Sequence, residues 1–308
     1  MNIPALIGEY PTSFFVFEFL TWGLVFGGLI FGIHFLRQKK YSWGIFFLLM
    51  FLIVVQGSFF EPRKLVVREF EMTDPDLPPL RIALLADIHV GPYKSYAWTR
   101  KLVQKLNSLE NIEAVVLPGD FVFGGAQKYG PHLFPLRHIR AVKKWATLGN
   151  HDHDIVEPRN TEQSQTVSYF LREYGLQELK NTAEYWPEKD LWIVGTDDND
   201  LDYHDLDAAY EKVGGMNILL AHSPDIVDDL GDHKPNLILS GHTHCGQIRL
   251  PFLGALPFTI PTENGKKLES HLYEKNGNRI FITCGVGEVG PRARLLNPPE
   301  IVILNINQ

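Results

Sequence analysis

Cysteine is scarce in this chain, with only Cys245 and Cys284 among 308 residues. Two cysteines can form one bridge, but they cannot form the disulfide framework that holds small secreted domains together. The sequence leaves open whether the two residues pair and which redox compartment the protein occupies. The hydrophobic content of 45% is typical of one sizeable globular domain with an additional segment, or of two domains.

An excess of positive charge is also missing. The net charge is −7, and no run of Lys and Arg is long enough for a nucleic-acid-binding arm. A nucleic-acid backbone requires a basic groove, so we expect no nucleic-acid partner. Internal repeats and low-complexity tracts are absent as well, which excludes a repeat architecture. Nothing in the sequence indicates an obligate protein partner.

Long hydrophobic runs, by contrast, fill the beginning of the chain. Residues 14–36 are interrupted only by Glu18 and His34, and a second run covers residues 43–60. Each run has about the ~20 residues that a helix needs to cross a bilayer. A soluble core helix rarely lacks a polar face for so long, and a cleaved signal peptide would not be followed by a second run. We therefore predict a membrane anchor of two transmembrane helices in residues 1–62 and a globular domain in residues 63–308.

The charge flanking these runs predicts their orientation. The loop at residues 37–40 is basic, and no Lys or Arg precedes the first run. The positive-inside rule places this loop in the cytoplasm and the globular domain on the outer side. The basic residues between 63 and 68 favour the opposite orientation, so a cytoplasmic domain stays the alternative. We expect Glu18 to lie near the membrane interface.

The rest of the chain consists of short apolar runs that end in polar residues and alternate with helical segments near residues 96–109 and 162–174. Continuous apolar runs are typical of strands buried on both faces, and their alternation with helices predicts an α/β layered fold. Ligands in such folds bind beyond the carboxyl ends of the strands. The runs that matter here are Leu80–Ala86, Ala114–Leu117, Trp145–Leu148, Met216–Ala221 and Asn236–Leu239.

The polar residues that follow these runs are carboxylates, imidazoles and one carboxamide. They are Asp87, His89, Asp120, Asn150, His151, His222, His242 and His244. Such a set without thiolates suits divalent metals of intermediate hardness rather than a structural cysteine–zinc site. It is too large for one ion and about large enough for two, and two ions ~3.5–4 Å apart are a common arrangement for phosphoester hydrolysis.

The order of these motifs resembles the calcineurin-like metallophosphoesterase superfamily. The matching elements are Asp-x-His at 87–89, Gly-Asp at 119–120, Gly-Asn-His-Asp at 149–152, His222, and Gly-His-x-His at 241–244. Each element is common by itself, but all five in this order are specific. The resemblance implies a four-layer α/β/β/α sandwich and a metal-dependent phosphoric ester hydrolase.

The resemblance also implies roles for individual residues. The first metal would be held by Asp87, His89 and His244, the second by Asn150, His222 and His242, with Asp120 bridging both. The expected metal is Mn, with Fe, Zn or Co as alternatives. A hydroxide bridging the two ions would attack phosphorus in line. His151 would act at the leaving oxygen, and Asp152 would orient His151.

Residues 241–247 and the apolar stretch after them resemble membrane-associated bacterial phosphoesterases, including some UDP-2,3-diacylglucosamine hydrolases of lipid A synthesis. Many members have Gly where this chain has Cys245, which we interpret as a tolerated small side chain, with a soft metal ligand as the alternative. Residues 250–260 are expected to form a hairpin packed on the core, and otherwise an apolar rim or a membrane contact. Arg292 and Arg294, in the Gly- and Pro-rich loop 285–299, are candidates for phosphate binding.

These observations predict a dinuclear-metal phosphoesterase anchored in the bacterial cytoplasmic membrane by its amino-terminal hairpin. Its substrate would be a phosphomonoester, a phosphodiester or a pyrophosphate, with a lipid-linked compound favoured. The alternatives are a UDP-2,3-diacylglucosamine pyrophosphatase and a metal-binding membrane protein without turnover. His153 and the aspartate-rich residues 195–202 are interpreted as local structure and as a solvated loop.

Overall fold

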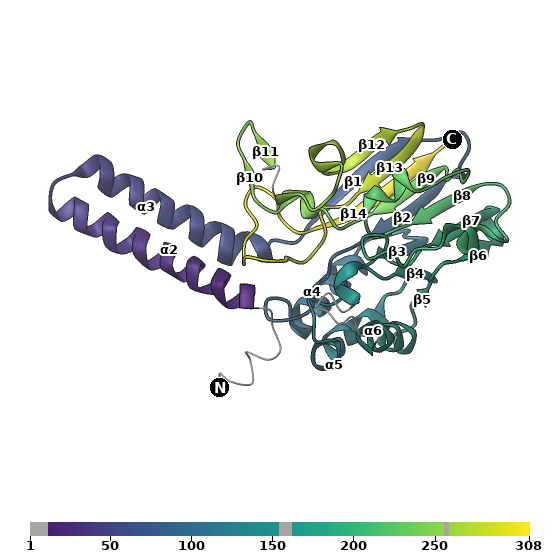
Figure 1. The fold of residues 1–308 in the computed structure, drawn as a ribbon, viewed down its shortest axis with the longest axis horizontal. Coiled ribbons are helices and arrows are strands. Elements are labelled where there is room, and N and C mark those ends of the chain that lie inside the picture. Colours follow the sequence, from purple (N-terminus) through teal and green to yellow (C-terminus); the bar gives the residue numbers. More distant parts are fainter. Residues whose placement is uncertain (1–11, 154–161, 256–258) are drawn as a thin grey trace.

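Two long helices extend from a layered domain in the computed structural model, which describes residues 12–153, 162–255 and 259–308 (Figure 1). Helix α2 covers Thr12–Arg37, and α3 covers Tyr41–Val55 and continues through a π-helical turn, η1 (Gln56–Phe60), and a 3₁₀ turn, η2 (Glu61–Arg63). Both helices are long and apolar enough to cross a membrane. They cover the two hydrophobic runs of the sequence at residues 14–36 and 43–60.

Glycines allow α2 and α3 to approach closely. A Cβ atom on Gly32 would lie 2.7 Å from Leu48, and one on Gly44 would lie 2.6 Å from Leu36. Small residues at helix contacts are typical of membrane helices, which associate by close packing because lipid provides no hydrophobic driving force.

Two six-stranded sheets form the body of the domain. The first has the order β1 (Val66–Thr73), β14 (Glu300–Asn307), β2 (Leu80–Leu84), β3 (Ala114–Pro118), β4 (Lys143–Thr147), β5 (Gln177–Glu178). The second has the order β12 (His271–Lys275), β13 (Asn278–Ile282), β9 (Leu237–Ser240), β8 (Asn217–Leu220), β7 (Leu191–Gly195), β6 (Thr182–Trp186). A separate small hairpin pairs β10 (Arg249–Leu250) with β11 (Gly254–Ala255).

The two sheets pack face to face and are covered by helices on their outer sides (Figure 1). The core between them includes Trp145 of β4, Leu220 of β8 and Leu239 of β9, all buried. On the outer face of the first sheet lie α4 (Tyr96–Leu106), α5 (Ala126–Tyr129), η3 (Gly130–His138) and α6 (Glu162–Glu173). On the outer face of the second lie α7 (Leu206–Tyr210) and η6 (Pro224–Asp228). The predicted α/β/β/α arrangement is therefore confirmed.

Parallel pairing brings the carboxyl ends of the central strands to one edge of the sandwich. In the first sheet β2, β3 and β4 are parallel, and in the second β7, β8, β9 and β13 are parallel. The polar residues that follow these strands must therefore meet between the two sheets.

The amino-terminal helices are not detached from this domain. Phe14 and Phe15 at the start of α2 pack against the apolar cluster beneath α4 and η3. One turn further on, the Glu18 carboxylate accepts a hydrogen bond from the Tyr93 hydroxyl at 3.0 Å and pairs with Arg292 at 3.2 Å. The helical pair thus leaves the domain next to loop 285–299.

Candidate metal centre

The loops after β2, β3 and β9 hold the predicted ligands in an uncommon backbone conformation. The φ angles of Asp87, His89, Asp120, His242 and His244 lie between 47° and 67°. Residues other than glycine rarely adopt this left-handed region, and such strain, at roughly 1–3 kcal/mol per residue, accumulates at functional sites. The surrounding fold therefore maintains these five residues against their own backbone preference.

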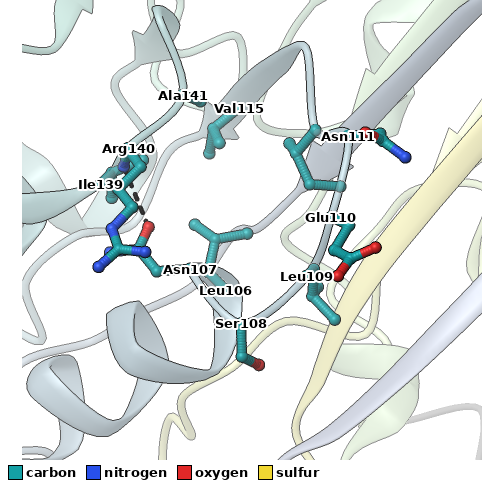
Figure 2. Close-up of a pocket in the computed structure, with 11 residues that line it drawn as sticks. Leu106, Asn107, Ser108, Leu109, Glu110, Asn111, Val115, Ile139, Arg140 and Ala141 are labelled. Carbon is teal, nitrogen blue, oxygen red and sulfur yellow. Dashed lines mark hydrogen bonds between the residues drawn. The ribbon is translucent and has the colours of Figure 1, made fainter.

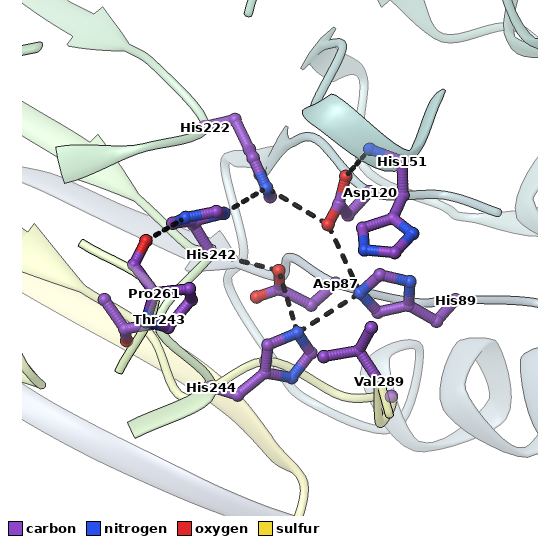
Figure 3. A network of polar contacts seen from close by, with 12 residues as sticks. Asp87, His89, Asp120, His151, His222, His242, Thr243, His244, Pro261 and Val289 are labelled. Carbon is purple, nitrogen blue, oxygen red and sulfur yellow. Dashed lines mark hydrogen bonds and ion pairs between the residues drawn. The ribbon is translucent and has the colours of Figure 1, made fainter. Parts of the chain in front are cut away.

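A first cluster consists of Asp87, His89, Asp120 and His244, whose potential ligand atoms all lie within 4.8 Å of one another. The Nε2 atoms of His89 and His244 are 3.2 Å apart, and Asp87 Oδ1 lies 3.6 Å from His244 Nε2. All four residues are buried. Figure 3 shows their side chains pointing toward one another.

A second cluster shares Asp120 with the first and adds His222 and His242. Asp120 Oδ2 lies 3.3 Å from His89 Nε2 and 3.1 Å from His222 Nε2, so one carboxylate oxygen faces both clusters (Figure 3). His242 Nδ1 is 3.2 Å from His222 Nε2. Nitrogen and oxygen donors arranged in this way fit two divalent ions with a common carboxylate.

Backbone carbonyls orient the imidazoles of the second cluster. His222 Nδ1 donates to the Pro118 carbonyl at 2.9 Å, and His242 Nε2 donates to the Pro261 carbonyl at 2.6 Å. Asp200 Oδ2 also lies 2.9 Å from His242 Nε2. With a proton held on these outer nitrogens, His222 Nε2 and His242 Nδ1 are free to accept a metal.

Buried charge controls the protonation of this centre. Burial opposes a charge on His222, but Asp120, Asp87 and Asp198 outweigh it and raise the pKa of His222 well above its usual range. Burial lowers the pKa of His244 well below its usual range, helped by His89 and Arg294, so His244 is neutral at pH 7. Such a surplus of carboxylate charge is typical of a site that binds cations.

His151 and Asn150 lie in η4 (Asn150–Asp152), directly after β4. The ring of His151 lies 4.8 Å from that of His89, and burial lowers the pKa of His151 to about 4. The His151 backbone N–H donates to Asp120 Oδ1 at 2.9 Å. Asn150 Oδ1 is buried without a hydrogen-bond partner, as expected of an oxygen available to a metal.

Asp152 has a different contact from the one expected. Its Oδ1 accepts the backbone N–H groups of Phe121 and Val122, and its Oδ2 accepts that of Gly149. The His151 ring nitrogen Nδ1 faces the Phe123 carbonyl at 3.3 Å instead. Asp152 thus joins the loops after β3 and β4, and we expect it to position Asp120 and Asn150 rather than the His151 ring.

The interpretation of residues 195–202 as a solvated loop is wrong for its first half. Asp197 and Asp198 are buried. Asp197 pairs with His153 at 2.8 Å and with Lys180 at 3.0 Å, which allows its burial. Sequence reasoning missed Asp198 and Asp200, although they follow the apolar strand β7 just as the predicted ligands follow theirs.

Cys245 and Cys284 form a disulfide, with Cα atoms 4.8 Å apart. Cys245 directly follows His244, and Cys284 follows β13, the neighbour of β9. The bridge therefore rules out both interpretations of Cys245, as a tolerated small side chain and as a soft metal ligand. A further group of potential ligands, His271, Cys284 and Glu300, lacks a free thiolate for the same reason.

The two arginines of loop 285–299 contact protein groups. Arg294 is fully buried, and its guanidinium donates to the carbonyls of Gly287 and Cys284, both at 2.7 Å. The Arg292 guanidinium pairs with Glu18 and lies over the rings of Phe59 and Tyr93. We therefore expect both arginines to hold this loop rather than the substrate.

A cavity of about 450 Å³ lies elsewhere, between the carboxyl end of α4 and the amino end of β3 (Figure 2). Its lining includes Leu106, Asn107, Glu110 and Arg140. It contains no residue of the metal centre and lies at the opposite end of the parallel strands. We assign it no part in the chemistry.

Comparison with known proteins gives a consistent result. The sequence profile described as calcineurin-like phosphoesterase matches residues 80–246. An uncharacterized metallophosphoesterase of Helicobacter pylori is 28% identical over 74% of this chain, and the match spans 60% of that protein's length. Phosphodiesterase YaeI of Escherichia coli is 29% identical over 74% of this chain and 82% of its own.

One relative is named as a transmembrane protein. The "Transmembrane protein with metallophosphoesterase domain" of Danio rerio is 28% identical over 80% of this chain and 58% of its own length.

Proposed function

The chain belongs to the calcineurin-like phosphoesterase family, and on that basis we propose that it hydrolyses a phosphoester with two divalent metal ions at a membrane surface. The observation that carries this proposal is the single Asp120 oxygen that lies within 3.3 Å of His89 and 3.1 Å of His222. One carboxylate placed between two sets of imidazoles supports a pair of ions rather than one.

Asp87, His89 and His244 would hold one ion and Asn150, His222 and His242 the other, with Asp120 between them. Divalent ions bound there supply an activated water and neutralise charge on the phosphoryl oxygens. The identity of the ions rests on the donor set, for which Mn is our first choice and Fe, Zn or Co the alternatives.

His151 would serve the leaving group. Because burial lowers its pKa to about 4, the imidazole is neutral at pH 7. A neutral imidazole can donate a hydrogen bond from a ring nitrogen to the departing oxygen and so stabilise the charge that develops there. We expect His151→Gln to retain both metals and to lower kcat by roughly 10²–10⁴-fold.

Membrane attachment is indicated by α2 and α3 and by the name of the Danio rerio relative. We propose that residues 1–62 anchor a catalytic domain formed by residues 63–308. The basic loop at residues 37–40 would face the cytoplasm. The Cys245–Cys284 disulfide supports a domain on the outer side, because such bridges persist in oxidising compartments.

The position of the anchor favours a substrate in the membrane. Gly57 at the end of the second span and loop 285–299 are joined by the Arg294 backbone N–H, which donates to the Gly57 carbonyl at 2.8 Å. The same loop contacts the metal centre, since Asn297 Nδ2 donates to the His244 carbonyl at 2.7 Å. The phosphoester group of a lipid-linked substrate would therefore lie close to the ions while its lipid stays in the bilayer.

The test is hydrolysis by the full-length protein in detergent micelles with added Mn. The substrates are mono- and bis-p-nitrophenyl phosphate, a phospholipid and UDP-2,3-diacylglucosamine, each compared with Asp120→Ala. We expect metal-dependent release that the variant lacks. A protein that binds two ions per chain and turns over none of these substrates would contradict the proposal and favour a metal-binding protein without turnover.

A further inference from the structure

The tip of the β10–β11 hairpin presents large apolar side chains to the exterior. The Phe252 side chain is fully exposed, and the relative exposure of Leu253 is 65%. Hairpin tips that face water ordinarily carry Gly, Asn or Asp. Phe252 also has a φ of 67°, which bulky residues rarely adopt. A strained and exposed phenylalanine is doubly unfavourable in water, so this tip fits an apolar environment.

Backbone hydrogen bonds tie this hairpin to the end of the membrane helices. Arg249 of β10 donates to the Leu295 carbonyl at 2.9 Å, and Leu295 donates to the Gln247 carbonyl at 3.0 Å. The preceding residue, Arg294, donates to Gly57 of η1 at 2.8 Å. The hairpin, loop 285–299 and the end of the second helix thus form one continuous surface.

Two further apolar side chains on that surface are exposed to solvent. Leu296, next to Leu295, is 55% exposed, and Phe60, at the end of η1, is 63% exposed. Figure 1 shows the β10–β11 hairpin at the end of the domain from which α2 and α3 extend. Among the described residues, these exposed apolar side chains lie around the exit of the two apolar helices, an arrangement that fits a lipid surface.

The length of α2 sets the level of the bilayer. Glu18 is held to the domain by Tyr93 and Arg292, so α2 leaves the protein surface at this point. The helix from Glu18 to its last residue, Arg37, rises ~29 Å, close to the ~30 Å of a hydrocarbon core. The interface of the leaflet next to the domain therefore lies at the level of Glu18, Arg292 and loop 285–299.

We propose that Phe252 and Leu253 enter the interfacial layer of the bilayer that α2 and α3 cross, giving the domain a second membrane contact. This inference rests on the membrane anchoring proposed above. Apolar side chains of this kind bury ~5–10 Å into the boundary between headgroups and acyl chains. The hairpin begins directly after the metal-binding segment 241–246, so its insertion turns the metal centre toward the lipid headgroups.

The first experiment reports depth in the membrane and does not depend on activity. An environment-sensitive dye is attached to Phe252→Cys in full-length protein, which is then placed in nanodiscs of phosphatidylcholine and phosphatidylglycerol. Wild-type protein, whose two cysteines are paired, gives the labelling background. Val142→Cys, at an exposed valine that precedes β4 at the far end of the strands, is the matched control, and Leu20→Cys in α2 reports the anchor.

We expect the dye at position 252 to shift its emission to the blue and to be quenched by lipids that carry a spin label near the headgroup. The dye at position 142 should show neither effect. Quenching at position 20 without quenching at position 252 would overturn the inference and leave the anchor intact. Quenching at neither position would overturn both. A blue shift at position 252 that appears only at high protein density, without quenching by lipid, would mean that the tip contacts a second copy of the chain. That result would also overturn the inference.

A second experiment separates substrate presentation from chemistry. The double substitution Phe252→Asp with Leu253→Asp leaves every predicted metal ligand in place. We expect the KM for a phosphoester embedded in vesicles to rise about tenfold, while hydrolysis of soluble p-nitrophenyl phosphate is unchanged. An unchanged KM for the embedded substrate would contradict a role of the tip in bringing the centre to lipid.

Discussion

Among single residues, the glycines around Asp87 leave no room for a side chain. A Cβ atom on Gly285 would lie 2.6 Å from Asp87 Oδ2, and the residue has a φ of 70°. Gly241 is similarly close, with a Cβ position 2.8 Å from the same oxygen. The carboxylate is therefore packed against backbone on two sides, and its position depends on the absence of side chains there.

Gly285→Ala should displace Asp87 and weaken metal binding. The matched control is Gly277→Ala, because Gly277 has a similar φ of 77° but nothing within 4 Å of a Cβ position. Both variants carry the backbone strain, roughly 1 kcal/mol, and only Gly285→Ala adds the clash. Metal titration by calorimetry should show at least a tenfold loss of affinity in Gly285→Ala alone. Equal losses in both variants would mean that strain, and not the contact with Asp87, is responsible.

Asp198 should make the stability of the metal-free protein depend on pH. Burial, reinforced by Asp200 and Asp120, raises the pKa of Asp198 to about 6. A carboxyl whose folded pKa is raised favours folding at low pH, and this contribution is lost as the pH rises from about 4 to about 6. At pH 7 the charged carboxylate therefore destabilises the fold by roughly 3 kcal/mol.

The Asp198→Asn variant should thus unfold at higher denaturant concentration than wild type at pH 7.5 and at about the same concentration at pH 4. Urea titrations of the metal-free protein in detergent, followed by tryptophan fluorescence, measure this difference. A variant that is less stable than wild type at pH 7.5 would contradict the prediction.

The raised pKa of His222 gives metal binding its own pH dependence. A metal binds the neutral imidazole, so the ion must displace a proton wherever His222 is protonated. Apparent affinity should therefore increase with pH until the pH exceeds the raised pKa, by about tenfold per unit for each proton released. Metal titrations at pH 6, 7 and 8 measure this slope, and an affinity that is flat over this range would show that His222 is already neutral.

Among the structural elements, the strands and the polar residues at their carboxyl ends could be predicted from the sequence, and the partners of several loops could not. Apolar runs ended at polar residues, and parallel pairing then brought Asp87, Asp120, His222 and His242 together as expected. The contacts of Asp152 and the burial of Asp197 depend on residues far away in the chain. Local composition cannot distinguish an aspartate paired with distant lysine and histidine side chains from a solvated one.

The disulfide joins the loops after β9 and β13, and we expect it to affect both stability and metal affinity. His244 and Cys245 have φ angles of 47° and 50°, so this segment is strained in the oxidised protein. A bridge that closes a separation of 39 residues contributes about 4 kcal/mol by loop entropy.

Reduction of the disulfide should weaken the metal site formed by His244 by about 10–100-fold, because the strained segment can then relax. The site formed by His222 and His242 should change less. Metal titration before and after treatment with reductant measures both. The double variant Cys245→Ser with Cys284→Ser should resemble the reduced protein and no longer respond to reductant. Unchanged affinity after complete reduction would contradict this prediction.

For the whole molecule, hydrogen bonds and an ion pair cross the boundary that we propose between the anchor and the domain. The Asn297 backbone N–H donates to Glu61 Oε1 at 2.6 Å, and the buried Lys94 ammonium donates to the Pro62 carbonyl at 2.6 Å. Lys94 also pairs with Glu288 at 2.8 Å. Residues that belong to the anchor by composition therefore satisfy buried groups of the domain.

A fragment that begins at residue 63 should be less stable than one that begins at residue 56, although both lack the two long helices. Loss of Glu61 leaves the buried N–H of Asn297 without its acceptor, at roughly 1–3 kcal/mol, and loss of Pro62 leaves Lys94 with Glu288 but without its carbonyl acceptor. Denaturant midpoints of the two purified fragments make the comparison. Equal midpoints would mean that water replaces both contacts.

The position of β14 has a consequence for biosynthesis. Among the described strands β1 emerges first, next to the proposed anchor, and it pairs with β14 alone, which also pairs with β2. During translation the first sheet therefore stays open at β2 until the residues from Glu300 onward have left the ribosome. In the anchored protein that we propose, the helices hold this unfinished sheet beside the membrane throughout. The nascent domain is thus exposed to chaperones and proteases until β14 has been synthesised.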